Sequence, residues 1–205
     1  MTDTNAAPLT RIQQKNRDLI LQGALDAFSA NGFRGATIDQ IARASGLSKP
    51  NVLYYFSSKD ELHKALLTTL LDMWLAPMQQ IDPDGDPLHE VLGYVQAKLL
   101  MSRDFPRESR LFAYEILQGA PHLTQVLGGG LRDIVDRTVD VLNRWMDQGL
   151  LARVDPRHLI FSIWSMTQHY ADFEIQVRAV LGRGRDPFEE GACFLDDLYR
   201  KLLTP

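Results

Sequence analysis

Apolar residues recur every three to four positions along most of the chain, which is the spacing of helices that bury one face. The first such helix is expected from Thr10 to Asn31, since Asn31-Gly32 is a typical helix stop. Its predicted buried stripe consists of Ile12, Leu19, Ile20, Ala24, Ala27 and Phe28. The alternation of β-branched and polar residues that marks half-buried strands is missing from the sequence. The pattern therefore predicts an all-α protein.

Turn-rich breaks divide the rest of the chain into further helices. Ser57 and Ser58 precede a helix expected over 59–75, and the acidic turn 82–86 separates it from the next one. Later helices are expected over 88–103, 108–117, 123–147, 156–181 and 187–203, with a glycine weakness at 128–130. The short polar segment 1–8 is expected to form a disordered arm.

Residues 37–56 have the pattern of two short helices joined by a tight turn. Thr37 and Ser48 are good N-caps, because a hydroxyl can accept from the unpaired amides of a first turn. Gly46 can adopt the positive φ that ends the first helix. The residues expected to face inward are Ile38, Ile41, Ala42, Val52, Leu53 and Phe56. This spacing predicts a helix-turn-helix.

The outer side of this motif suits DNA. The major groove admits a helix whose N-terminal residues meet base edges, and Lys49 and Asn51 stand at that position. Tyr54, Tyr55 and Lys59 are better placed for phosphate oxygens. A buried hairpin filled with aromatic residues would not need tyrosines and lysines on its solvent side. The predicted DNA-binding residues are Thr37, Ser48, Lys49, Pro50, Asn51, Tyr54, Tyr55 and Lys59.

The stretch from Phe28 to Leu62 resembles the TetR family of one-component transcriptional regulators. It contains F-x-x-x-G-F-x-G-x-T-I-D-x-I-A-x-x-S-G-L-S, then Y-Y-F-x-x-K-x-x-L. The resemblance implies a three-helix helix-turn-helix DNA-binding domain over 1–57. It also implies a helical ligand-binding and dimerisation domain over 58–205. In such proteins the helix over 59–75 connects the two, and its tilt sets the spacing of the heads in a dimer.

Charge and composition support a DNA-binding N-terminal part and a C-terminal part that does not bind DNA. The net charge is −4, yet the first 60 residues are net positive and the remainder is net negative. We therefore expect only the N-terminal part to meet phosphates. Cys193 is the only cysteine, so no intrachain disulfide can form. An apolar leader and a run of ~18 apolar residues are both missing, so we expect a cytoplasmic protein without a membrane span.

Three stretches of the C-terminal part resemble TetR-family regulators of pyrimidine utilisation. They are D-x-W-L-A-P from residue 72, S-R-L-F from residue 109, and W-x-x-T-Q-H-Y-A-D-F from residue 164. The resemblance implies a pocket for uracil, with thymine bound less well. An effector of this kind would release the protein from DNA. The predicted ligand-binding residues are Trp74, Leu75, Trp164, Gln168 and Tyr170.

The chemistry of these side chains fits a planar amide or imide. Trp164 and Gln168 are four residues apart, on one helical face. The Gln168 amide offers a donor beside an acceptor, and Trp74 or Trp164 offers a flat wall. Alternatives remain open: Trp164 fills the core, Gln168 bonds Glu115 or the backbone, or the effector is another small apolar or heterocyclic metabolite.

The last two predicted helices carry more apolar residues than one intramolecular face uses, which favours a homodimer. These residues are Leu159, Ile160, Ile163, Trp164, Met166, Thr167, Phe194, Leu195, Leu198, Leu202 and Leu203. Enzyme function is not expected, because no nucleophile adjoins a base and no glycine-rich phosphate loop is present. The five histidines are scattered without metal-ligand spacing, so neither a metal nor a cofactor is expected. A ligand-free architectural DNA binder would not need the acidic, aromatic-rich C-terminal part.

Overall fold

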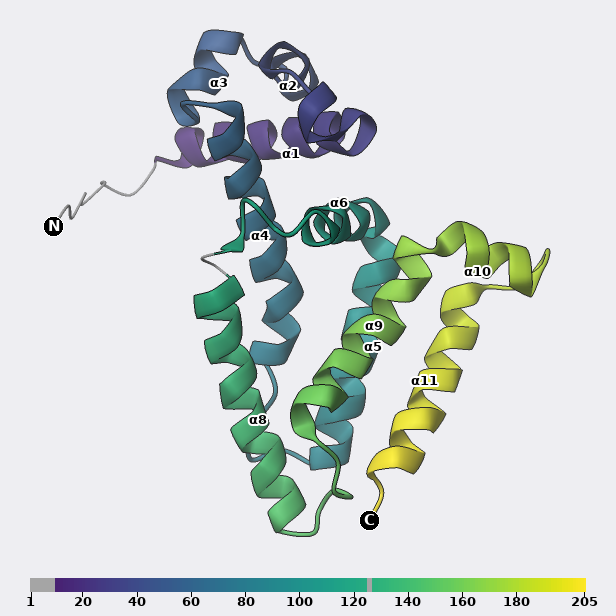
Figure 1. Cartoon of the computed structure of the whole chain (residues 1–205). Helices are drawn as coiled ribbons and strands as arrows, with labels where there is room; N and C mark the ends of the chain where they lie inside the picture. Colours follow the sequence, from purple (N-terminus) through teal and green to yellow (C-terminus); the bar gives the residue numbers. More distant parts are fainter. Residues whose placement is uncertain (1–9, 125–126) are drawn as a thin grey trace, which may run out of the picture. The chain divides into compact units, whose positions relative to one another are not determined.

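A computed structural model of the chain describes residues 10–124 and 127–205 (Figure 1). Within these ranges every regular element is a helix and none is a strand, so the all-α prediction is confirmed. The segment 1–8 and residues 125–126 of the predicted helix 123–147 lie outside the described part. The chain divides into two compact units, Met1–Thr68 and Thr69–Pro205. We call their described residues the head and the body. The boundary after residue 57 stays a prediction.

The head consists of α1 (Arg11–Gly35), α2 (Ile38–Ser45), α3 (Lys49–Tyr55) and the start of α4 (Lys59–Gln79). Its core is a cluster of fully buried side chains, namely Ile20, Ala24, Phe28, Ile41, Val52 and Phe56. Gly23 allows α2 to approach α1, since a Cβ there would lie 2.8 Å from the Ser45 amide nitrogen. The prediction that Ile12 and Leu19 join this core is wrong, because Ile12 is 73% and Leu19 40% exposed.

The ends of α2 and α3 are capped by the residues that the sequence predicted. The Thr37 hydroxyl accepts from the Gln40 amide at 3.2 Å, and the Gln40 side chain accepts from the Thr37 amide at 2.8 Å. Gly46 ends α2 with a φ of 69°. The Ser48 hydroxyl accepts from the Asn51 amide at the start of α3. Leu53 was expected to face inward but is 38% exposed, because Val52 and Phe56 already fill that side.

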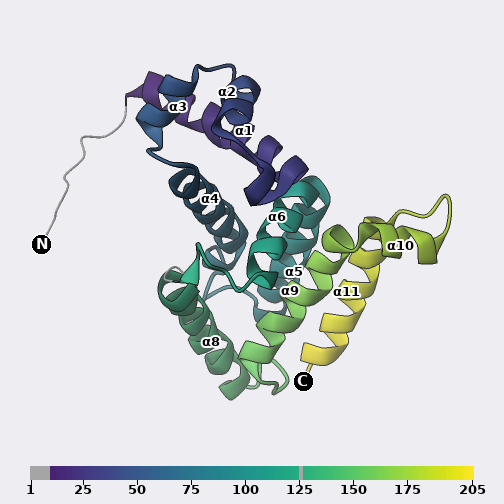
Figure 2. The same ribbon diagram turned by 45° about the horizontal axis from the view of Figure 1, so that its top comes forward.

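The body is built around α5 (Pro87–Asp104), which packs against α9 (Pro156–Asp172) and α11 (Pro187–Leu203). Figures 1 and 2 both show these three helices side by side. The body also contains the part of α4 from Thr69 onward, α6 (Pro106–Leu117), α8 (Arg132–Asp147), α10 (Glu174–Leu181) and the π-helix η1 (Leu127–Leu131). A single apolar core joins α5, α8, α9, α11 and the later part of α4, with Trp145, Leu142, Ile160, Ile163 and Leu195 among its members.

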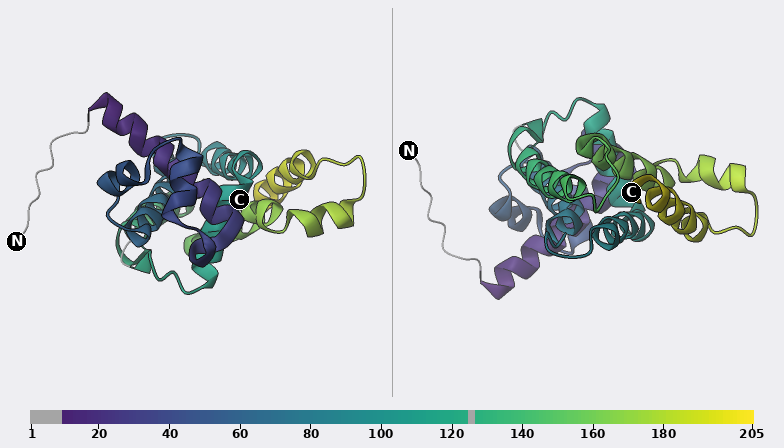
Figure 3. Two further views of the ribbon diagram at one scale, coloured as in Figure 1. Left: turned by 90° about the horizontal axis from the view of Figure 1, so that it is seen from above. Right: turned by 90° about the horizontal axis from the view of Figure 1, so that it is seen from below.

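Two predicted boundaries in the body are wrong, and one predicted irregularity is confirmed. The helix predicted to end at residue 75 continues to Gln79, with Pro77 inside its last turn. The glycine weakness expected at 128–130 is confirmed, because this segment lies in a π-helix in place of regular α-helix. The helix predicted over 156–181 breaks at Phe173, and α10 then extends away from the other helices of the body (Figure 3).

The break at Phe173 has a tertiary cause. Arg110 of α6 donates to the Ala171 carbonyl at 3.0 Å, and Ser109 donates to the Asp172 carboxylate at 2.7 Å. These two side chains hold the last turn of α9 against α6. Burial raises the pKa of Asp172, while the Ser109 hydrogen bond and the nearby Arg110 oppose that rise.

Candidate DNA-binding and ligand-binding sites

The exposed N-terminal turn of α3 is the candidate base-reading surface. Lys49 and Pro50 are exposed, and Asn51 is half-buried. The Lys49 ammonium lies 2.9 Å from the Asp39 carboxylate of α2. Both side chains of this pair are at least half exposed, so water screens the attraction. The pair therefore orients Lys49 across the turn without burying its charge.

The two tyrosines that end α3 differ in their surroundings. Tyr54 is 72% exposed, whereas the Tyr55 hydroxyl accepts from the Asn16 side chain of α1 at 3.2 Å. Their rings meet edge to face, with centroids 5.2 Å apart. The exposed Tyr54 is thus available to a phosphate. The Tyr55 hydroxyl accepts a hydrogen bond from α1, and its own O–H can still donate to a phosphate.

Lys59 has a structural contact that the sequence did not reveal. Its ammonium donates to the Phe33 carbonyl at 2.8 Å and to the Ala36 carbonyl at 3.0 Å. It also lies 4.6 Å from the centroid of the Phe33 ring. An ammonium has three N–H bonds, so one is left for a phosphate. Lys59 therefore braces the turn between α1 and α2 in addition to its predicted role.

In the body, the predicted ligand residues belong to two helices. Trp74 and Leu75 lie on α4 and are buried. Trp164 lies on α9, where its indole N–H donates to the Tyr94 hydroxyl of α5 at 2.6 Å. Burial raises the pKa of Tyr94, so this hydroxyl stays protonated. The Trp164–Tyr94 bond fixes the plane of one predicted wall.

Lys98 is the residue of this region that sequence reasoning missed. It is 2% exposed, and its ammonium lies 4.5 Å from the centroid of the Trp74 ring. Its one hydrogen bond to a described residue is a long contact of 3.5 Å to the Trp74 carbonyl. Burial lowers the pKa of Lys98 to about 7. The signal was present, because Lys98 follows Tyr94 by four residues on the buried stripe of α5.

Gln168 and Tyr170 have different environments. The half-buried Gln168 side chain makes no hydrogen bond to any other described residue. Glu115 was weighed as its partner but instead accepts from the His122 amide at 2.8 Å. Tyr170 packs beside α11, where a Cβ on Gly191 would lie 2.7 Å from its ring. Gln168 is thus available to a ligand, whereas Tyr170 is engaged in helix packing.

The comparisons with known proteins divide the chain much as its contacts do. Residues 67–205 match the family described as "YcdC-like protein, C-terminal region". Residues 20–66 match "Bacterial regulatory proteins, tetR family". The chain belongs to the TetR family. It is 47% identical to the HTH-type transcriptional regulator RutR of Escherichia coli over 173 residues, which cover 84% of this chain and 82% of RutR.

A more distant relative and two solved structures are also similar to this chain. HTH-type transcriptional regulator TcmR of Streptomyces glaucescens is 25% identical over 69% of this chain and 59% of its own length. A transcriptional regulator from Streptomyces coelicolor matches with a TM-score of 0.72 at 23% identity, covering 93% of this chain and 99% of that one. AibR in complex with isovaleryl coenzyme A and operator DNA matches with a TM-score of 0.67 at 20% identity, covering 93% and 99%.

Family membership confirms several expectations. The protein is a TetR-type DNA-binding transcriptional regulator with an N-terminal helix-turn-helix, and it is not an enzyme. Members of this family bind DNA operators and small-molecule effectors, usually as dimers. None of the helices in the described residues is long and apolar enough to cross a membrane.

Proposed function

We propose that the protein is a homodimeric repressor that leaves its operator when the body binds uracil or a related pyrimidine. The observation that carries this proposal is the 47% identity to RutR, which extends through most of the chain. The body stretches that resemble pyrimidine-responsive regulators contain Trp74, Leu75, Trp164 and Gln168. We place such a repressor in the cytoplasm, where it meets both DNA and metabolites.

Exposed apolar side chains on α9 and α11 support the homodimer. About half of the predicted interface set is buried within one chain, namely Leu159, Ile160, Ile163, Thr167, Leu195 and Leu203. Those left at the surface include Met166, Phe194 and Leu202, and the neighbouring Phe161 joins them. Packing these residues against the same helices of a second copy would form a four-helix bundle between subunits.

The two heads of this dimer would read two half-sites of the operator. The recognition helices need to enter major grooves about 34–36 Å apart. Lys49, Pro50 and Asn51 would meet base edges, and Thr37 and Ser48 would hold the helix ends at the backbone. Tyr54, Tyr55 and the remaining N–H of Lys59 would donate to phosphates. The operator contacts would thus come from both helices of the motif.

Effector and operator would shift the same conformational equilibrium of the dimer in opposite directions. We expect the pyrimidine to bind more tightly to a dimer conformation in which the spacing of the two heads does not match the operator. Pyrimidine and DNA then lower each other's affinity for the protein by the same factor. The half-buried Gln168 amide suits the edge of a cyclic imide, because its donor and acceptor lie side by side. A TetR-type regulator responding to a different small apolar or heterocyclic metabolite is the second candidate.

Isothermal titration of the purified protein with uracil tests the proposal. We expect saturable binding in the micromolar range or tighter, and release of operator DNA at the same uracil concentrations. A protein that binds operator DNA but neither binds nor responds to uracil would reject the pyrimidine effector in favour of the second candidate. A metabolite panel would then identify the effector.

A further inference from the structure

Two polar hydrogen-bond donors are buried in the body without a good acceptor. The Trp74 indole nitrogen is inaccessible and has no hydrogen-bond partner among the described residues. The Lys98 ammonium, which lies against the same indole, has only the long contact to the Trp74 carbonyl. A buried donor without an acceptor costs roughly 1–3 kcal/mol, and more when it is charged. Two such groups in contact are an unusual way to build a core.

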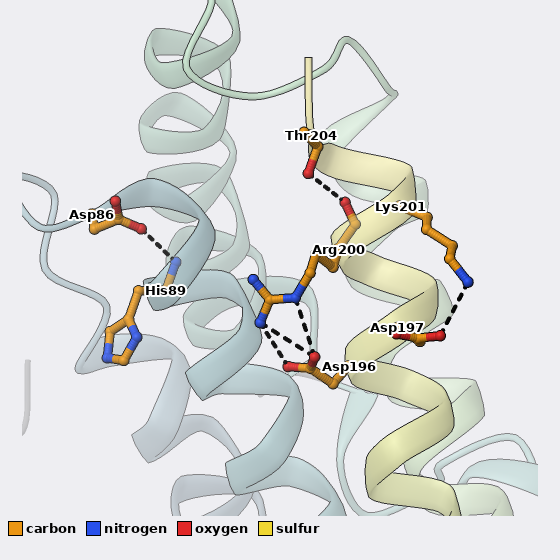
Figure 4. Close-up of polar contacts among 7 residues, drawn as sticks. All are labelled: Asp86, His89, Asp196, Asp197, Arg200, Lys201 and Thr204. Atoms are coloured by element: carbon orange, nitrogen blue, oxygen red, sulfur yellow. Dashed lines mark hydrogen bonds and ion pairs between the residues drawn. The ribbon is translucent and has the colours of Figure 1, made fainter.

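The carboxylates on the helices packed around α5 are engaged elsewhere or exposed. On α6, Glu115 binds His122. On α9, Asp172 accepts from Ser109, and on α11 Asp196 pairs with Arg200, as Figure 4 shows. On α4, Asp72 is exposed. Among other titratable groups on α5 and α9, Tyr94 accepts from Trp164, and the exposed His169 stacks on Phe173 with ring centroids 5.0 Å apart. Within the described chain, Lys98 has no carboxylate at ion-pair distance.

We propose that Lys98 recognises the effector, by donating from its ammonium to a carbonyl or ionised imide oxygen held over Trp74. The inference rests on the proposed function, and it names the group on the ligand that the body detects. The site supplies donors in excess, so the ligand must supply acceptors. A cyclic imide carries two carbonyl oxygens and an acidic N–H, and it is flat enough to lie against an indole. Lys98 thereby selects acceptor-rich heterocycles over purely apolar ones.

An acceptor beside the ammonium also changes its protonation. In the protein without ligand, burial favours the neutral amine. A carbonyl or imide oxygen in contact with the nitrogen favours the charged form. A ligand that keeps its imide proton, or that is already ionised in solution, therefore draws a proton from solvent onto Lys98 when it binds above pH 7. Proton uptake is a signature that a lysine serving only to fill space would not give.

Calorimetric titrations with uracil at pH 8 test this inference, in two buffers that differ in their ionisation enthalpy. The variants are Lys98→Met, which keeps the stem, and Trp74→Phe, which keeps a ring but removes the indole N–H. Lys201→Met is the matched control, because Lys201 pairs with Asp197 on the side of α11 away from α5 (Figure 4). We expect Lys98→Met to weaken uracil binding by tenfold or more and to abolish proton uptake. We expect Trp74→Phe to weaken binding less, and Lys201→Met to match the natural protein.

The outcomes separate this inference from the proposed function. Equal affinity and equal proton uptake in the natural protein and in Lys98→Met would overturn the role of Lys98 while leaving the pyrimidine effector intact. If uracil gives no heat but barbiturate or hydantoin binds in a Lys98-dependent way, the inference stands and uracil is rejected. If the folded natural protein binds none of these cyclic imides, both proposals are wrong.

Discussion

Two lysines of the head and one lysine of the body lie in contrasting environments. Lys49 of the head pairs with Asp39 at the surface, and Lys59 donates to two backbone carbonyls. Lys98 of the body is 2% exposed and meets an aromatic face with one long hydrogen bond. Exposed pairs contribute little to stability, whereas a poorly satisfied buried charge costs several kcal/mol. Charges in the head are thus ready to meet a partner at low cost, while the charge in the body destabilises the fold until a partner arrives.

Removing the buried charge gives the largest expected change in stability. Below pH 7, Lys98 is charged in both states and the folded protein bears the full cost of burial. Above pH 7 the folded protein loses this proton while the unfolded chain keeps it up to about pH 10.5, so stability rises with pH across that window. Lys98→Met should therefore raise the free energy of unfolding by roughly 3–5 kcal/mol at pH 6, a gain that falls by about 1.4 kcal/mol per pH unit above pH 7.

Urea unfolding at pH 6, 8 and 9.5 measures this difference. Lys201→Met, on the surface of the same unit, should change stability by less than about 0.5 kcal/mol at every pH. If Lys98→Met is less stable than the natural protein at pH 6, the buried charge does not destabilise the body and the proposed difference between head and body is wrong.

The second prediction separates the two units by function. Gln168→Ala should abolish the response to ligand, with uracil affinity lowered at least about tenfold, because the amide supplies both a donor and an acceptor. DNA affinity without ligand should be unchanged, since the substitution lies in the body. Calorimetry with uracil and fluorescence anisotropy with operator DNA provide the two readouts. An unchanged uracil affinity would show that Gln168 does not line the pocket.

The third prediction concerns phosphate contacts of the head. Tyr55→Phe combined with Lys59→Ala should weaken binding to every DNA sequence and reduce the salt slope by about one for each lost ionic contact. Because Lys59 also holds the Phe33 and Ala36 carbonyls, the head should lose about 1 kcal/mol of stability. Anisotropy titrations at several salt concentrations are the measurement, with Tyr55→Phe alone as the control. A loss restricted to one operator would contradict the phosphate role.

The smallest expected effect comes from the surface pair. Asp39→Ala removes the partner of Lys49, and the pair is worth about 0.2–1 kcal/mol at most. Thermal unfolding should therefore change little, while operator affinity at low salt should rise because a negative charge near the recognition turn is lost. If Asp39→Ala lowers the free energy of unfolding by more than about 1 kcal/mol, the exposed pair contributes more to stability than expected for a surface pair.

The range of the contacts that form each feature explains which features the sequence could predict. The caps at Thr37 and Ser48 and the positive φ at Gly46 depend on neighbouring residues, so the helix-turn-helix followed from local rules. The break after Asp172 depends on Ser109 and Arg110, about sixty positions earlier, and local spacing could not reveal it.

The candidate ligand site shows the same limit. Helical phase placed Trp164 and Gln168 on one face, but it did not single out Lys98, because lysine is rarely buried. Only the packing of α4 against α5 brings its ammonium to Trp74. Residues that act through tertiary contacts thus escaped prediction more often than residues that act through local turns.

The distribution of tryptophan has an optical consequence. All three tryptophans, at positions 74, 145 and 164, belong to the body, while Tyr54 and Tyr55 are aromatic residues of the head. Indole emission excited near the red edge of its absorption band therefore reports on the body alone. An ammonium over the Trp74 ring perturbs the excited state of that indole, so the emission wavelength should change as Lys98 gains or loses its proton. The protein thus contains its own spectroscopic probe of the buried lysine, and no added dye is required.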